Sequence, residues 1–528
     1  MSFNKDQLSS IEEIQKFLNL LNPEQLFLLN GAAGTGKTYL ISHLFNDEKY
    51  KYKKIAFTAP TNKAVSVIRL LNPIISKNVS YITTHKLLGI TRQVEDDGTI
   101  NFTENETPGE KWDNIDYIII DEASMVSRTI YRTLLKKLEE TPKKIKVIFV
   151  GDIHQLPPVN EDISSVFSKV KLKSNLKIIE RYKNSIVTYA NSIRNNIKIK
   201  KSDLDTDVKF IKDEQKWLDN YIKNYQDSII LAYTNKKVNS LNDKIRNTLF
   251  ENVEQKFNHN EKIVFNSYYY FNCNNFYSSQ IGIISYLETK QHKLKVFDKE
   301  YLLNTKIKVD MDTKEILVKT KTLEEPCPIC YEENVDNVSQ TECGHKFCSC
   351  CIKLWLQNHN QCPMCRFTIK TNGNIEIKND TVLSELVNKF CSLTENLEFK
   401  VYYMSIDIEN EPTRDILVLH EDSQETYDQT KEEFIDLLHK MKKYVYKRSR
   451  DYFNKQLLIN LWNFFYQEYV DIFANINYGY AMTVHKSQGS TYKNVYLHLK
   501  NILLNKQELK QCIYTGITRA SNNLKIMT

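Results

Sequence analysis

The feature that most constrains the fold is a glycine-rich octapeptide placed between an apolar run and a helical pattern. Leu26–Asn30 reads as a buried strand, residues 31–38 have the sequence GAAGTGKT, and a helical pattern continues to about Phe45. A strand, such a loop and a helix, in this order, make a phosphate-binding loop whose backbone N–H groups surround phosphate oxygens. The alternative is a chance glycine-rich turn. The predicted ATP-binding residues are Gly31, Ala32, Ala33, Gly34, Thr35, Gly36, Lys37 and Thr38.

Side-chain chemistry assigns roles within this loop and at the end of a second strand. Lys37 supplies a point charge to the outer phosphates, and the Thr38 hydroxyl is a ligand for Mg²⁺. Tyr117–Ile120 is a second buried strand that ends in Asp121 and Glu122. A carboxylate at this place can hold the water shell of the metal, and its neighbour can orient and deprotonate the attacking water. We therefore predict Lys37, Asp121 and Glu122 as catalytic.

A third strand, Val147–Val150, runs into a segment that resembles a known family. Residues 151–159 read GDIHQLPPV, which is similar to motif III of superfamily 1 helicases of the RecD- and Dda-like branch. The resemblance extends along the chain to motif Ia (58–65), motif Ib (83–88), motif IV (180–182), motif V (480–491) and motif VI (514–520). It implies that Gln155, Arg181 and Arg519 contact the terminal phosphate, that Gln7 reads the adenine, and that Gly489 belongs to the ATP site.

The resemblance also implies a fold class, an α/β chain with two RecA-like domains and ATP bound between them. The expected parts are a first domain at 1–178, a second domain at 179–250 and 476–528, and an accessory insertion with a small β-barrel at 251–475. Closure of the cleft on ATP and its reopening after hydrolysis would move one nucleic-acid grip relative to the other.

The same motifs imply a track for single-stranded DNA across both domains. Short polar groups hold phosphates without reading sequence, and bases stack on rings of any kind. An ordinary surface or capping role is the alternative for each residue. The residues assigned to the track are Pro60, Thr61, Asn62, His85, His485 and Lys486.

Between motif Ib and Asp121, two short alternating runs flank Asp97-Gly98, a pair typical of a hairpin turn. In RecD- and Dda-like helicases an insertion at this place is the pin that parts the duplex. We predict a pin over residues 89–112 that contacts forked DNA through Phe102; a passive surface hairpin is the alternative. The resemblance implies 5′-to-3′ travel, which the chemistry of the residues does not reveal.

Eight of the eleven cysteines fall between residues 327 and 365. Pairs of cysteines with two residues between them can bind one Zn²⁺ ion together. The cysteines and His345 supply enough ligands for two complete, structural zinc sites. This order of ligands resembles a C3HC4 RING finger, expected at 322–370. The family's interleaved pairing gives two sets of zinc ligands, namely Cys327, Cys330, Cys348 and Cys351 for one ion, and Cys343, His345, Cys362 and Cys365 for the other.

RING ligases present a groove to a ubiquitin-conjugating enzyme, and the resemblance places this groove at Ile329, Trp355 and Pro363, with Arg366 against ubiquitin. A zinc clip that only stabilises the insertion is the alternative. Three functions therefore stay open: a helicase with a ligase module, a helicase with a structural or docking zinc module, and an ATP-gated translocase that unwinds nothing.

Composition adds limits rather than a function. The 72 basic and 65 acidic residues give a net charge of +7, which permits a polyanionic partner. The sequence carries neither a signal peptide nor a long apolar segment, so we expect a protein of the cytoplasm or nucleus, without a membrane partner. We also expect the motor to be a monomer. The bias towards Lys, Asn and Ile suggests an AT-rich genome, such as that of a large DNA virus acting in its host, or of a protist.

Overall fold

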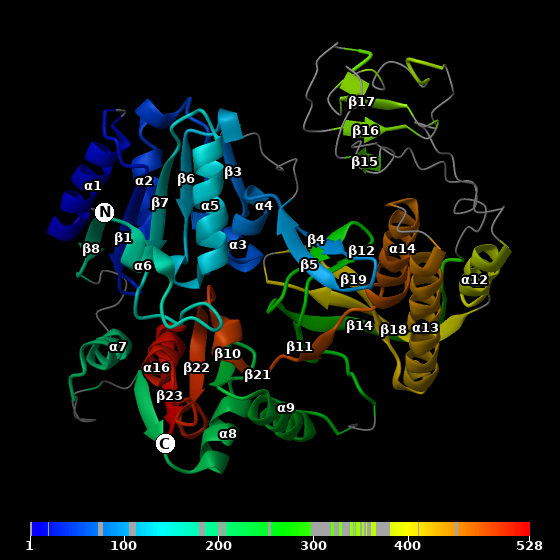
Figure 1. Ribbon diagram of the computed structural model, residues 1–528. Coiled ribbons are helices and arrows are strands. Elements are labelled where there is room, and N and C mark those ends of the chain that lie inside the picture. The colour runs from blue at the N-terminus through cyan, green and yellow to red at the C-terminus, as the bar shows by residue number, and fades with distance from the viewer. Residues whose placement is uncertain are drawn as a thin grey trace.

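The computed structural model places two parallel sheets side by side, with an antiparallel unit and a small zinc-finger-like unit next to them (Figure 1). The structure describes residues 3–19, 21–71, 78–104, 112–178, 185–198, 204, 207–251, 255–296, 318–320, 327–329, 338–341, 343, 345–348, 351–352, 355, 361–365, 381–395, 397–409, 411–448 and 452–528. None of the helices in these ranges is both long and apolar enough to cross a membrane.

The first motor domain is a six-stranded parallel sheet with strand order β3-β2-β6-β7-β1-β8. Its central strands are buried on both faces, as expected for a parallel sheet covered by helices. One hydrophobic cluster lies on each side of this sheet. The strands are β1 (Leu26–Gly31), β2 (Ile55–Ala59), β3 (Val79–Thr83), β6 (Tyr117–Ile120), β7 (Lys146–Gly151) and β8 (Leu172–Leu176), and the helices are α1 (Lys5–Leu18), α2 (Lys37–Phe45), α3 (Asn62–Leu71), α4 (Thr84–Leu87), α5 (Arg128–Glu140) and α6 (Ser165–Lys169).

The second motor domain is a five-stranded parallel sheet with strand order β21-β10-β22-β23-β9. Its strands come from two segments far apart in the chain, because the accessory insertion separates β10 from β21. The strands are β9 (Val208–Ile211), β10 (Ser228–Ala232), β21 (Ala481–Thr483), β22 (Tyr492–His498) and β23 (Ala520–Met527), and the helices are α7 (Ser185–Asn195), α8 (Glu214–Ile222), α9 (Asn235–Leu249), α15 (Leu499–Ile502) and α16 (Leu509–Thr518). The chain therefore has the two α/β domains that the motifs imply.

The accessory insertion contains a five-stranded antiparallel sheet of order β19-β18-β14-β11-β20. Because β20 pairs with β11, the insertion extends through residue 478, slightly beyond the expected boundary. Its strands are β11 (Lys262–Phe265), β12 (Tyr269–Phe271), β13 (Asn274–Phe276), β14 (Ile281–Lys293), β18 (Glu398–Asp407), β19 (Arg414–Leu419) and β20 (Ile476–Tyr478), and its helices are α12 (Thr381–Ser392), α13 (Gln424–Arg448) and α14 (Tyr452–Phe464), which a π-helical turn extends to Val470.

Two buried charged residues attach this sheet to the second motor domain. The Glu261 carboxylate lies 2.8 Å from Nε of Arg246 on α9. The neighbouring Lys262 amine donates to two carbonyls in the turn that precedes β10 and to the carbonyl of its first residue, Ser228, at 2.9 Å. Burial lowers the pKa of Lys262 to about 8. Because buried charges are costly unless they are paired, these contacts hold the two units in one orientation.

Two small units complete the fold. The expected pin is a hairpin of β4 (Ile90–Val94) and β5 (Ile100–Glu104), which leaves the first motor domain and reaches α14 of the insertion (Figure 1). The segment with the cysteine cluster forms a three-stranded sheet of β15 (Val318–Thr320), β16 (Val338–Gln340) and β17 (Lys346–Cys348).

Candidate functional site

The phosphate-binding loop follows β1 and ends where α2 begins at Lys37. Gly34 and Gly36 have φ values of 81° and 79°, a backbone conformation that glycine adopts readily and other residues rarely do. The Lys37 amine donates to Gly31 O at 2.8 Å and to Ala32 O at 3.0 Å. Ala33, Gly34, Gly36, Lys37 and Thr38 line one cavity, whereas Gly31, Ala32 and Thr35 are buried.

The two acidic residues after β6 face this loop. The Thr38 hydroxyl donates to Oδ2 of Asp121 at 3.1 Å, which brings together the two groups predicted to hold Mg²⁺. Glu122 has a φ of 53°, unusual for a residue with a side chain, and such strain is characteristic of functional sites. Burial raises the pKa of Glu122, although Arg519 opposes the rise. A carboxylate with a raised pKa suits a general base.

Gln155 lies on the same cavity, in the loop that follows β7. Its side chain is buried, and its Oε1 atom has no hydrogen-bond partner among the described residues. An unpaired buried amide end is costly unless a ligand satisfies it. Together with the paired Thr38 and Asp121, this orphaned acceptor fits a site that holds a metal ion and hydrogen-bond-donating water molecules.

The second motor domain supplies the opposite wall of this cavity of about 660 Å³. Gly489, Thr491, Thr518 and Arg519 line it from that side. Arg519 is 5% exposed, and its guanidinium donates to Ser490 O at 3.2 Å and to Thr515 O at 3.2 Å. The structure thus places Arg519 and Lys37 on one cavity. Arg181, the other expected phosphate contact, lies outside the described residues.

Gln7 also lines the cavity, but its side chain already has partners. Its Oε1 atom accepts from the Asn4 backbone N–H at 3.1 Å in a capping box at the start of α1. Its Nε2 group donates to Thr35 O at 3.1 Å. In this arrangement Gln7 ties α1 to the phosphate-binding loop, and reading of an adenine would require these bonds to change.

The contacts between the two motor domains involve residues that the sequence analysis does not single out. The Tyr514 hydroxyl donates to Oδ2 of Asp152 at 2.6 Å, and the Leu156 N–H donates to the Thr515 hydroxyl at 3.1 Å. Gln488 donates to Leu156 O at 3.1 Å. All five residues belong to motifs III, V and VI, and this membership is the one feature of the sequence that could have marked them as functional. Only contacts in space show that they meet.

The residues assigned to the DNA track come from both motor domains. Pro60, Thr61 and Asn62 form the entry to α3, and the Thr61 hydroxyl caps its first turn. Gly489 of the second domain faces this turn, where an added side-chain carbon would lie 3.4 Å from Ala64. The start of α3 is therefore where motif Ia meets motif V.

The remaining track residues differ in their surroundings. His85 is half-buried on α4, and burial lowers its pKa, so it is a neutral group. In the turn after β21, His485 Nε2 lies 3.3 Å from a Glu508 oxygen. The Lys486 amine donates to Oδ1 of Asn266 at 2.9 Å, which connects motif V to the inserted sheet. Lys486 is the residue whose charge suits a phosphate contact.

The pin differs from a free hairpin. Its turn is docked, because the indole of Trp462 donates to Asp96 O at 3.3 Å and the Tyr466 hydroxyl donates to Gly98 O at 2.8 Å. The strand face with Phe102, whose side chain is 69% exposed, is open to solvent. Contact with a duplex would therefore use the side of the hairpin rather than its tip.

One of the two expected zinc sites is assembled in the described residues. One potential ligand atom from each of Cys343, His345, Cys362 and Cys365 lies within 4.8 Å of the others, an arrangement that suits a tetrahedral Zn²⁺ ion. Burial alone would raise the pKa of the Cys343 thiol. Hydrogen bonds with Thr341 and His345 outweigh this effect and lower the pKa to about 6. This set of donors fits zinc.

The second set is described only in part. The Cys348 N–H donates to Sγ of Cys327 at 3.3 Å. Cys351 is described and half-buried, whereas Cys330 lies outside the described residues. Of the expected groove, Ile329 and Trp355 are half-buried against the cysteine cluster. The Trp355 indole donates to Gln361 O at 2.9 Å. Pro363 is half-buried, and Arg366 lies outside the described residues.

Comparisons with known families agree with these units. Residues 15–161 match an AAA domain, residues 325–366 match a Ring finger domain, and residues 478–527 match a UvrD-like helicase C-terminal domain. Protein R530 of Acanthamoeba polyphaga mimivirus is 25% identical over 567 residues, which cover 99% of each chain.

Two further similarities cover different shares of the molecules. The RecBCD enzyme subunit RecD of Buchnera aphidicola is 33% identical over 204 residues, which are 34% of this chain and 31% of RecD. A structure of Pif1 helicase from Bacteroides, in complex with ADP-AlF3 and single-stranded DNA, aligns at 14% identity and a TM-score of 0.44, over all of this chain and 93% of that one. The matched domains and the motif geometry support a superfamily 1 helicase with an inserted RING finger.

Proposed function

We propose that the protein is an ATP-driven motor that travels along single-stranded DNA and separates duplex at a fork. The observation that carries this proposal is the shared cavity, which Lys37 lines from the first motor domain and Arg519 from the second. A nucleotide in this cavity would contact both domains. Its binding and loss would therefore change how the two domains lie relative to each other.

The residues on the cavity suggest a division of labour in hydrolysis. Thr38 and Asp121 would hold Mg²⁺, which neutralises phosphate charge when bound. Glu122 orients the attacking water and accepts its proton. Gln155 and Arg519 contact the terminal phosphate, where negative charge develops during transfer. The raised pKa of Glu122 supports its role as base. Gln155 would donate to the phosphate through its amide Nε2, and its orphaned oxygen would accept from the attacking water.

Strand separation is assigned to the pin, and translocation to the track at the start of α3 and after β21. The exposed Phe102 face gives the pin an aromatic surface on which a base at the fork can stack. We infer 5′-to-3′ travel from the likeness to the RecD- and Dda-like branch. A translocase that leaves duplex intact is the competing function, and the exposed pin favours unwinding.

The test combines ATP hydrolysis with unwinding of duplexes that carry a single-stranded tail at either the 5′ or the 3′ end. Wild type is expected to hydrolyse ATP when single strands are present, and to unwind the 5′-tailed substrate. Lys37→Ala is expected to lose both activities, because the charge on the outer phosphates is gone, and to retain its zinc. ATP turnover at the wild-type rate by Lys37→Ala would refute the assigned site. Turnover without unwinding by wild type would support the translocase.

A second activity is proposed for the RING finger, which we infer binds two zinc ions and positions a ubiquitin-conjugating enzyme. The partly exposed Ile329 and Trp355, and the exposed Met364, favour a docking surface over a zinc clip. A RING finger performs no covalent step and acts by orienting the charged conjugate.

Discharge of ubiquitin from charged conjugating enzymes tests the ligase activity. Wild type is expected to accelerate discharge, and Ile329→Ala is expected to lose the acceleration while it keeps its zinc and its ATP hydrolysis. If no conjugating enzyme in a representative panel is discharged faster by wild type, the zinc module is a structural or docking unit.

A further inference from the structure

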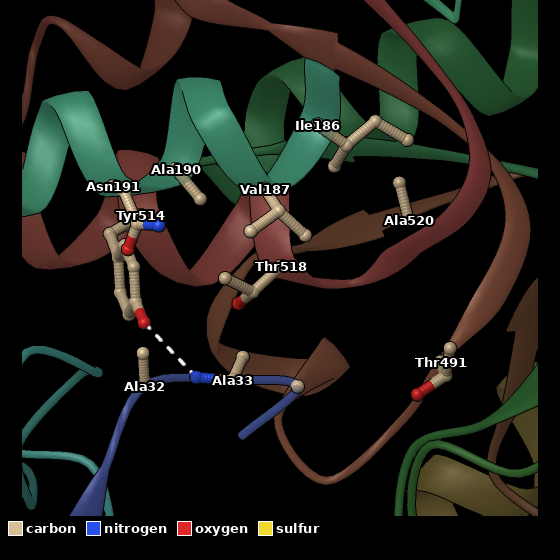
Figure 2. A pocket seen from close by; sticks show the side chains of 11 residues that line it. Ala32, Ala33, Ile186, Val187, Ala190, Asn191, Thr491, Tyr514, Thr518 and Ala520 are labelled. Atoms are coloured by element: carbon tan, nitrogen blue, oxygen red, sulfur yellow. Dashed lines mark hydrogen bonds between the residues drawn. The ribbon is translucent and has the colours of Figure 1, made fainter. Parts of the chain in front are cut away.

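Tyr514 occupies an unusual place between the two motor domains. It lies on α16, five residues before Arg519, and its side chain is 1% exposed. Its hydroxyl accepts a hydrogen bond from the Ala33 N–H of the phosphate-binding loop at 3.3 Å. The same hydroxyl donates to Oδ2 of Asp152 at 2.6 Å. Figure 2 shows the Tyr514 ring reaching from its helix to the loop at Ala33.

The hydrogen bond from Tyr514 to Asp152 connects α16 to the loop that carries Gln155. Asp152 is 1% exposed and starts the loop that carries Gln155. At the far end of this loop, the Leu156 N–H donates to the hydroxyl of Thr515. Adjacent residues of α16 thus hold both ends of the loop that presents Gln155 to the cavity.

The same helix also determines where Arg519 lies. The Arg519 guanidinium donates to Thr515 O at 3.2 Å and to the Thr518 hydroxyl at 3.4 Å, so it rests on the last turn of α16. A hydrogen bond from Tyr514 to the first domain therefore restricts how α16, and Arg519 with it, can slide or rotate against the phosphate-binding loop.

The local chemistry keeps the hydroxyl in its donor form. Burial raises the pKa of Tyr514, and the nearby Asp152 carboxylate raises it further. A neutral phenol donating to a buried carboxylate is a charge-assisted hydrogen bond, stronger than one between two neutral groups. The Tyr514 ring itself lines a pocket with Ile186, Val187 and Ala190 of α7 (Figure 2), so removal of the hydroxyl alone would leave the packing in place.

We propose that Tyr514 is a positioning residue, whose hydroxyl aligns Arg519 and the Gln155 loop with the phosphate-binding loop for ATP hydrolysis. This inference rests on the proposed function, because it requires ATP to be hydrolysed in this cleft. Tyr514 acts through Arg519 and contributes little to ATP binding, which depends on the backbone N–H groups of the loop and on Lys37.

Tyr514→Phe is the direct test, with Tyr221→Phe as the matched control. Tyr221 is also buried, but its hydroxyl donates to Tyr480 O inside the second domain. In DNA-stimulated ATP hydrolysis, Tyr514→Phe is expected to lower kcat roughly tenfold or more, the effect of losing one hydrogen bond to a charged group. The KM for ATP is expected to change less than about twofold, and Tyr221→Phe to resemble wild type in both constants.

A double-variant cycle separates positioning from general weakening of the structure. In an Arg519→Lys background, where the planar fork is already lost, Tyr514→Phe is expected to reduce kcat less than about twofold. The inference is overturned if Tyr514→Phe has wild-type kcat, or if it costs the same factor in both backgrounds. The Lys37→Ala variant shows whether a failure concerns Tyr514 alone or the proposed ATP site as a whole. If that variant is inactive while Tyr514→Phe is normal, the cleft assignment stands and the role of Tyr514 falls.

Discussion

The first motor domain contacts the rest of the molecule at two interfaces, here called seams, which differ in the contacts that hold them. At the nucleotide cleft, Tyr514, Thr515 and Gln488 form hydrogen bonds with the first domain beside a cavity of about 660 Å³. At the pin, Val94 is buried in the same hydrophobic cluster as Leu461 and Trp462 of α14. The first seam encloses a cavity and is held largely by hydrogen bonds, whereas the second combines apolar packing with hydrogen bonds to the pin turn.

This difference suggests different mechanical roles. Hydrogen bonds around a cavity can be exchanged for contacts with a ligand at small net cost, so the cleft is suited to opening and closing. Separation of a packed aromatic seam exposes apolar surface, which costs about 25 cal/mol for each Å². The inserted sheet is also held to the second domain by the buried Glu261 and Lys262. Movement of the second domain would therefore be transmitted to the pin.

The largest effect is expected from a substitution that removes the catalytic base in the cleft and keeps the size and shape of the side chain. Glu122→Gln removes the proposed general base, and we expect ATP hydrolysis to fall roughly a thousandfold, equal to about 4 kcal/mol of activation free energy. Measurement of DNA-stimulated turnover gives the loss. The hydrogen-exchange protection of pin amides is expected to stay at the wild-type level, because the second seam is untouched.

The pH dependence provides a control for this variant. Glu122 accepts a proton only as a carboxylate, and burial raises its pKa. Wild-type turnover should therefore fall as pH decreases through this raised pKa, earlier than for an exposed glutamate. The residual turnover of Glu122→Gln should lack this acidic limb. A limb that persists in the variant would assign the base to another group.

The next effect comes from opening the apolar seam. Trp462→Ala removes an indole that is 3% exposed and packs over Gly98, and we expect the local stability of the pin to fall by about 3 kcal/mol or more. Native-state hydrogen exchange of β4 and β5 amides measures this loss. Unwinding of a forked duplex should fall with it, while ATP hydrolysis on single strands is maintained. An equal loss of both activities would mean that the seam supports the motor itself.

A smaller effect is expected at the exposed face of the pin. Phe102→Ala should reduce the base pairs separated per ATP roughly tenfold, since stacking of one base on an aromatic ring is worth about 1–3 kcal/mol. Tyr286→Ala is a matched control, because Tyr286 is an exposed aromatic residue on β14, outside the pin. If both variants unwind like wild type, the hairpin is a passive surface feature.

Local signals predicted most of the parts of the molecule. The octapeptide at 31–38 and the acidic pair at Asp121 and Glu122 depend on short stretches of chain, and the structure brings them to one cavity. Asp97-Gly98 predicted a hairpin because the turn chemistry is local. In the same way, the spacing of the cysteines predicted a ligand cluster, of which Cys343, His345, Cys362 and Cys365 are assembled in the described residues.

The contacts between parts could not be predicted from such signals. Tyr514 and Asp152 are 362 residues apart, and nothing near either residue indicates that they pair. The helix α14 is apolar over much of its length, which predicts burial but names no partner. Its docking on the pin turn therefore appears only in the fold. The role of Gln7 in a capping box was missed for a related reason, since the same glutamine suits both a cap and an adenine contact.

The smallest expected effect concerns the ion pair at the edge of the apolar seam. Arg92 Nη1 lies 2.6 Å from Oδ2 of Asp471, and both side chains are more than one third exposed. Exposed pairs of this kind contribute about 0.2–1 kcal/mol and are screened by salt. Asp471→Asn should therefore lower the protection of pin amides by less than about 1 kcal/mol, and the difference should shrink at high salt.

This small effect is informative when it is compared with that of Trp462→Ala. If the seam is held by apolar packing, the ratio of the two losses should be about three or more, and should grow as salt is added. A loss of about 2 kcal/mol or more for Asp471→Asn would show that the pin is held by charge. In that case the two seams would be alike, and high salt should release the pin while leaving the cleft able to hydrolyse ATP.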